Sequence, residues 1–125
     1  MSEEFQKNVL GEKLEPCSSD PLTGWFRDGC CNTDDSDRGI HTVCARVTKV
    51  FLEWAKINGN DLITPHPEFE FPGLKEGDCW CVCAGTYAQA IEEGKACKIF
   101  LKKTNNKTLE IIPLEKLKKF AIDLS

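Results

Sequence analysis

Residues 78–84 read Asp78-Cys79-Trp80-Cys81-Val82-Cys83-Ala84, and this stretch carries the clearest alternation in the chain. Side chains alternate along a strand, so the three cysteines share one face while Trp80, Val82 and Ala84 share the other. A strand with two apolar faces is buried on both sides. We therefore predict a strand with both faces buried here and work outward from it.

The residues that follow predict a short helix and then a hairpin. Thr86 and Gln89 have the spacing of a capping box, which favours a helix over residues 87–93. The segments 98–103 and 108–112 flank an Asn-Asn pair that tolerates positive φ. We expect these two segments to form a β-hairpin.

Two further helices are expected, one before the strand and one at the end of the chain. Apolar residues recur at helical spacing over residues 42–57, and Gly59 can supply the left-handed conformation that ends a helix. Pro113 suits the first position of a closing helix, whose buried stripe would include Leu114 and Leu117.

The order of these elements predicts an α+β fold. The first forty residues are rich in turn formers such as Gly11, Pro16 and Pro21, so we expect a long irregular N-terminal third. No linker divides the chain, which we take as a single domain over residues 1–125. Without β-α-β alternation, the simplest architecture is a small two-layer sandwich, with helices packed on one side of an antiparallel or mixed sheet.

Charge and hydropathy exclude some classes of partner. The chain has 16 basic and 20 acidic side chains, so we expect no nucleic acid partner. Residues 1–7 lack the basic start and apolar run of a secretory signal, and no stretch has the length of a membrane span. We therefore expect a soluble, cytoplasmic protein, no membrane partner, and reduced cysteine thiols.

Five soft ligands gather in the loop-rich part of the sequence. They are Cys17, Cys30, Cys31, His41 and Cys44. Zinc prefers thiolate and imidazole ligands and stabilises segments that are poor in regular structure. Because His41 and Cys44 are three residues apart in an expected helix, they would share a face. The sequence thus indicates a structural zinc site formed from this set.

The remaining cysteines are less suited to metal. Same-face neighbours on a strand lie about 6.5–7 Å apart, whereas thiolates on one zinc lie roughly 3.8 Å apart. Neighbours among Cys79, Cys81 and Cys83 therefore cannot share an ion on a regular strand. We expect these three residues and Cys97 to pack as small buried side chains.

Two alternatives to metal binding remain open, and the function itself is unknown at this point. A thiol-dependent enzyme or redox protein could use Cys30 or Cys31 as its reactive thiol, with His41 as the base. An interaction domain would need neither metal nor catalysis.

The chain resembles a mostly bacterial, uncharacterised family, the domain of unknown function 2237. The resemblance rests on residues 23–33, on His41-Thr42-Val43-Cys44, and on residues 80–84. It implies a stand-alone soluble domain and adds no activity, and members usually lack a cysteine at position 79. It also implies that a site would be found among the matching positions, which are Cys17, Cys30, Cys31, His41, Cys44, Cys81 and Cys83.

Overall fold

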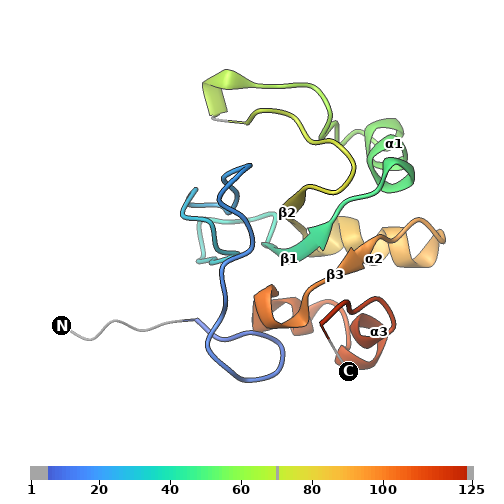
Figure 1. Cartoon of the computed structure of the whole chain (residues 1–125). Coiled ribbons are helices and arrows are strands. Elements are labelled where there is room, and N and C mark those ends of the chain that lie inside the picture. The colour runs from blue at the N-terminus through green and yellow to red at the C-terminus, as the bar shows by residue number, and fades with distance from the viewer. Residues whose placement is uncertain (1–5, 70, 124–125) are drawn as a thin grey trace.

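A computed structural model describes residues 6–69 and 71–123. Residues 1–5, which belong to the stretch that argued against a secretory signal, lie outside the described part. The fold is α+β, as predicted. Its helices and strands follow the order β1 (His41–Arg46), α1 (Lys49–Ile57), β2 (Cys79–Cys83), α2 (Ala84–Glu92), β3 (Lys98–Ile99) and α3 (Leu114–Lys118), with three short 3-10 turns between them (Figure 1).

The three strands form one antiparallel sheet in the order β2-β1-β3. In the register of β1 and β2, Val43 lies opposite Val82 and Cys44 lies opposite Cys81. The alternation predicted for residues 78–84 is confirmed, because Val82 joins the main core while Cys81 belongs to a separate cluster of cysteines. The sheet therefore has an aliphatic face and a sulfur face.

Helices cover the aliphatic face. Val43 and Ile99 from the sheet are fully buried in the same cluster as Phe51 of α1 and Tyr87 of α2. In Figure 1 the three α-helices lie to the right of β1 and β2. Within the described residues, no helix has both the length and the apolar character needed to cross a membrane.

The irregular N-terminal segment, residues 6–40, covers the sulfur face and contains no helix or strand. It appears in blue to the left of β1 and β2 in Figure 1. Backbone hydrogen bonds attach it to the rest of the chain, including one of 3.0 Å from Val9 N–H to the Thr104 carbonyl. The predicted irregular N-terminal third is confirmed, and it forms a layer of its own.

The helix predicted over residues 42–57 is wrong in its first third, which forms strand β1. Thr48 separates the two elements, because its side chain accepts a hydrogen bond from Phe51 N–H and caps α1. Helical spacing alone did not reveal that β2 would pair with this segment. The predicted end is confirmed, since α1 stops before Gly59, which has φ +88°.

The hairpin predicted over residues 98–112 is also wrong beyond its first two residues. Leu101–Lys103 and Asn106–Glu110 form 3-10 turns. Asn105 is buried, its N–H donates to the Thr42 carbonyl at 2.9 Å, and its side-chain amide donates to the Cys31 carbonyl at 3.1 Å. These distant partners hold Asn105 against β1 and the N-terminal segment, where it cannot serve as the tip of a hairpin.

The two helices that follow β2 were both predicted, with one error at the start of α2. This helix begins at Ala84 instead of residue 87, and Cys83 occupies the cap position without a side-chain cap. The capping box expected at Thr86 is therefore not formed. Helix α3 follows Pro113 and buries Leu117, as predicted.

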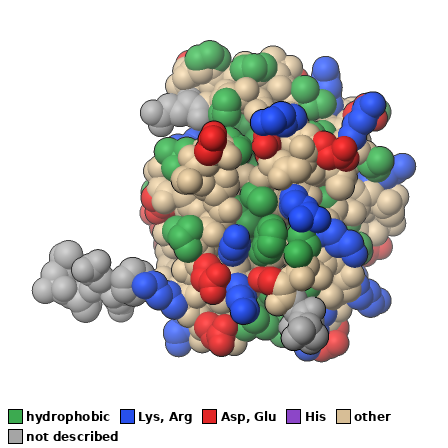
Figure 2. Space-filling model, viewed as in Figure 1, with side chains coloured by type: hydrophobic (Ala, Val, Ile, Leu, Met, Phe, Trp, Pro, Cys, Tyr) green, Lys and Arg blue, Asp and Glu red, His purple; other side chains and the backbone are tan. Residues whose placement is uncertain are grey.

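Charged side chains are spread over the surface. Figure 2 shows basic and acidic groups interspersed on the face that it views. Exposed ion pairs include Lys107 with Glu110 at 3.0 Å and Lys118 with Glu115 at 3.5 Å. Such pairs contribute at most about 1 kcal/mol each, so packing and cross-links dominate stability.

Candidate functional site

Four of the eight cysteines form two disulfides, Cys17–Cys44 and Cys31–Cys81. The expectation of reduced thiols is therefore wrong for these four residues. The partners are 27 and 50 residues apart in sequence, and each bond joins the N-terminal segment to a strand of the sheet. The sequence pattern did not reveal this pairing, because it depends on how the loop layer is laid across the sheet.

The two disulfides lie side by side in one buried cluster, which we call the four-sulfur cluster. The sulfur atoms of Cys17, Cys31 and Cys81 all lie within 4.8 Å of one another, and Cys44 is bonded to Cys17. The exposed fraction of the four residues runs from 0% to 6%. The cluster thus combines three of the five residues expected as metal ligands with Cys81, which was expected to pack and was also one of the positions matching the family.

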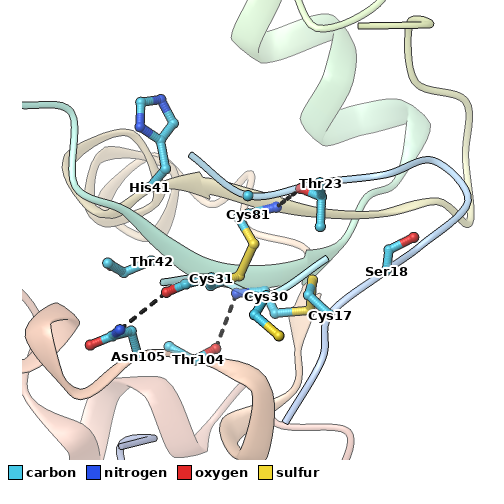
Figure 3. The surroundings of a disulfide bond; sticks show 12 residues. Cys17, Ser18, Thr23, Cys30, Cys31, His41, Thr42, Cys81, Thr104 and Asn105 are labelled. Carbon is cyan, nitrogen blue, oxygen red and sulfur yellow. Dashed lines mark hydrogen bonds between the residues drawn. A yellow bond between two sulfur atoms is a disulfide. The ribbon is translucent and has the colours of Figure 1, made fainter. Parts of the chain in front are cut away.

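The other two expected ligands do not join the cluster. Figure 3 shows the His41 ring pointing away from the sulfur atoms. Cys30 is a free, half-buried cysteine on the N-terminal segment. The zinc site expected from five residues is thus divided, and His41 belongs to a different group of side chains.

That second group consists of His41, Asp37 and Cys83. The His41 Nδ1 atom lies 2.6 Å from Asp37 Oδ1, and the buried Asp37 also accepts hydrogen bonds from His41 N–H and from Thr33 Oγ1. Cys83 lies beside the same ring, because it is paired with His41 in the sheet and because Cys83 Sγ and His41 Cε1 would lie 3.3 Å and 2.7 Å from one Cβ atom at Gly39. A carboxylate, an imidazole and a thiol are therefore neighbours.

Electrostatics keep the imidazole charged at neutral pH. The neighbouring Cys83 side chain is the largest cause that raises the pKa of His41 to about 9, with the hydrogen bond to Asp37 and the charge of Asp37 adding to it and burial opposing it. Cys83 also stands at the N-cap of the nine-residue helix α2, which has no side-chain cap.

The backbone before His41 is shaped to bring these groups together. A Cβ atom at Gly39 would lie 2.7 Å from His41 Cε1 and 3.3 Å from Cys83 Sγ, so a side chain at Gly39 would displace the pair. Ile40 adopts φ +51°, a strained conformation for a β-branched residue, while its carbonyl accepts from Ala84 N–H at 2.9 Å. Residues 39 and 40 thus dock His41 onto the start of α2.

A cleft of about 420 Å³ lies beside His41, a volume suited to a small ligand or one bulky side chain. The Trp25 ring stacks on His41 with centroids 5.5 Å apart, and the Arg27 guanidinium lies over the Trp80 ring at 5.0 Å. Aromatic side chains dominate its walls: Trp25, Phe69, Phe71 and Trp80. His41 is the residue that links this cleft to Cys83.

The thiols expected to react are less suited to that role. Cys31 is in a disulfide, and burial raises the pKa of the Cys30 thiol, with Asp28 adding to the rise and Lys13 opposing it. Burial likewise raises the pKa of Cys97 to about 12, in keeping with the packing role expected for it. The free thiol of Cys79 also has a raised pKa, mainly from burial.

Sequence reasoning identified His41 as a base but missed both of its partners. Asp37 lies four residues before it, so the acidic cluster at residues 34–37 was a usable local signal. Cys83 is far away in sequence and meets His41 only because the two residues are paired in the sheet. No local signal could have identified that partner.

Comparison with known proteins gives a family and no activity. No curated protein matches the chain. The family match spans residues 7–121, which include the four-sulfur cluster, the His41 group and the cleft. The chain belongs to the family described as uncharacterized protein conserved in bacteria (DUF2237).

Proposed function

We propose that the protein is a thiol-dependent enzyme in which Cys83 is the nucleophile, His41 the general base and acid, and Asp37 the positioning residue. The observation that carries this proposal is the His41 ring, which is bonded to the buried Asp37 and lies beside Cys83, its partner in the sheet. A nucleophile, a base and a group that orients the base are the parts of covalent catalysis by side chains. Cys83 thus replaces Cys30 and Cys31, with which the sequence had paired His41.

Acyl transfer is the reaction class that fits this arrangement. The Cys83 sulfur attacks the carbonyl carbon of an ester, thioester or amide, and the carbonyl oxygen becomes an oxyanion. His41 gives its proton to the leaving group as the acyl–sulfur bond forms. Water, deprotonated by His41, then attacks the acyl carbon and releases the carboxylic acid and the Cys83 thiolate.

The first turn of α2 supplies donors for the oxyanion. The N–H groups of a first helical turn have no acceptor within the helix, and those of Gly85 and Thr86 lie two and three residues after Cys83. A Cβ atom at Gly85 would meet nothing within 4 Å, so the space beside this turn is open. Donors at that position stabilise the developing charge.

Alkylation of the free cysteines tests the proposal. Iodoacetamide at pH 6.5, with mass spectrometry of the peptides, should label Cys83 ahead of Cys30, Cys79 and Cys97. An ordinary thiol is only a few per cent ionised near neutral pH, so we expect an advantage of about tenfold for a thiolate held by an imidazolium. Equal rates at the half-buried thiols would contradict the proposal.

Variants separate catalysis from a structural role. His41→Gln should remove the advantage of Cys83, and Asp37→Asn should shift the pH profile of labelling while Cys83 stays present. Gly39→Ala, which places a methyl group against His41 Cε1, should slow labelling as well. Cys30→Ser is the matched control and should leave Cys83 labelling unchanged.

Turnover of activated esters then tests the reaction class. The oxidised protein should release a phenolate from small aryl esters, and Cys83→Ser should abolish that release. Trapped acyl–Cys83 in intact-mass spectra would support acyl transfer. A reactive Cys83 that never becomes acylated would contradict this reaction class.

A further inference from the structure

The four-sulfur cluster of Cys17, Cys31, Cys44 and Cys81 is separate from the proposed catalytic group. Three of its sulfur atoms already lie within 4.8 Å of one another. Four thiolates around one zinc lie roughly 3.8 Å apart, since Zn–S bonds are about 2.3 Å long and tetrahedral. Only small side-chain movements would convert the paired sulfur atoms into such a set.

The backbone around the cluster is held by contacts that do not depend on the S–S bonds. Cys81 N–H donates to Thr23 Oγ1 at 2.8 Å (Figure 3). Cys44 N–H donates to Thr104 Oγ1 at 3.1 Å. The Asn105 side chain donates to the Cys31 carbonyl, as Figure 3 also shows. These contacts would keep three of the four cysteines in place after the disulfides open.

We propose that the reduced form of the protein binds one zinc ion through Cys17, Cys31, Cys44 and Cys81. Each disulfide takes two electrons and two protons from one molecule of a dithiol, whose own sulfur atoms then join in a disulfide. The four thiols formed lose four protons and bind Zn²⁺ as thiolates. The same four residues thus cross-link the N-terminal segment to the sheet in either redox state.

Chemistry favours these four residues over the set expected from sequence alone. A site of four thiolates is a common form of structural zinc, and such sites are closed and buried. Cys30 is not in the sulfur cluster, and the His41 ring is held by Asp37. The zinc site therefore gains Cys81 and loses Cys30 and His41.

Cobalt binding tests this site directly. Protein reduced with a phosphine, which competes less for metal than a dithiol, should bind one Co²⁺ per chain and show the absorption of tetrahedral thiolate coordination. Zn²⁺ should displace the cobalt and raise the melting temperature of the reduced protein. The oxidised protein should show no such absorption. Reduced, folded protein that binds no Co²⁺ would overturn the proposal.

Variants distinguish the two sets of ligands. Cys81→Ser should abolish stoichiometric Co²⁺ binding, whereas Cys30→Ser and His41→Gln should retain it. The reverse pattern would overturn the assignment. If Cys81→Ser does not fold, wild-type protein decides the matter, because zinc should protect the four cluster cysteines from alkylation and leave Cys30, Cys79 and Cys83 open to it.

Discussion

The two faces of the sheet are held by different means. On one face, Val43 and Ile99 pack against α1 and α2 in a large aliphatic and aromatic core. On the other face, Cys44 and Cys81 are bonded covalently to an irregular segment. The helices bury enough apolar surface to stay in place, whereas a loop layer without regular structure needs cross-links.

The cross-links that hold the loop layer are distinct from the side chains of that layer that could perform chemistry. The cross-linked layer contains Trp25, Arg27 and Asp37, which belong to the cleft or to the His41 group. Fixing that layer on the sheet brings Asp37 onto His41, which is paired with Cys83 at the end of β2. The four-sulfur cluster therefore positions the His41 group without belonging to it.

Loss of a cross-link should have the largest effect on stability. Replacing Cys31 and Cys81 together with alanine removes a bond that closes a loop of 50 residues. We expect the free energy of unfolding of the oxidised protein to fall by about 4 kcal/mol, measured by urea denaturation. Under metal-free reducing conditions the difference should shrink strongly, because the wild type then lacks the bond too. An equal loss in both conditions would show that packing holds this face as well.

Truncation on the helical face should be slightly less costly and independent of redox state. Ile99→Ala removes a fully buried side chain and should lower the free energy of unfolding by about 3 kcal/mol. The same loss is expected in oxidised and in reduced protein. Ile111→Ala is the control, since Ile111 is 41% exposed and its truncation should change stability by less than about 0.5 kcal/mol.

Loss of the contact between the loop layer and His41 should have a smaller, pH-dependent effect. His41→Gln removes a charged hydrogen bond to Asp37 and should cost about 2 kcal/mol at low pH. Folding raises the pKa of His41 from 6.5 to about 9, so its contribution is complete below pH 6.5 and is lost as the pH rises through about 9.

Denaturation of the His41→Gln protein and the wild type at pH 6 and at pH 10 checks this prediction. The two proteins should differ at pH 6 and converge toward pH 10. The matched control is His66→Gln, because the His66 side chain is 45% exposed and its Nδ1 lies 3.6 Å from the exposed Glu68 carboxylate. That variant should match the wild type at both pH values, and a wild-type curve that rises with pH over this range would contradict the sign.

The junction between the sheet and the helical layer should contribute least. Thr48 caps α1 through a 3.1 Å hydrogen bond from Phe51 N–H, so Thr48→Ala should cost about 1 kcal/mol in thermal or urea denaturation. Thr48→Ser keeps the hydroxyl group and should recover most of that loss. If serine and alanine were equally destabilising, the cap would not be the cause.

Local patterns predicted those elements whose boundaries are set by neighbouring residues. The alternation of β2, the end of α1 at Gly59 and the closing helix after Pro113 all followed from such patterns. Helical spacing failed over residues 42–48, because valines suit a strand as well as a helix and the choice was made by pairing with β2. The hairpin failed because the partners of Asn105 are distant in sequence.

The candidate site was likewise predictable from the sequence only in part. His41 and three of the clustered cysteines were recognisable by residue type and by their density in one segment. The roles of Cys81 and Cys83 were not, although both lie in the strand that sequence predicted best. Residue type indicates which chemistry a side chain can perform. Its actual role also depends on which other side chains lie within bonding distance, and the sequence does not show that.

By itself the sequence determined an α+β chain with an irregular N-terminal third, a buried cysteine-bearing strand and a family. Only the tertiary structure decided which sulfur atoms meet one another and which one meets His41. The physical reason is that periodicity and capping act over a few residues. The register of β1 with β2, and the path of the loop across them, depend on contacts between segments far apart in the chain.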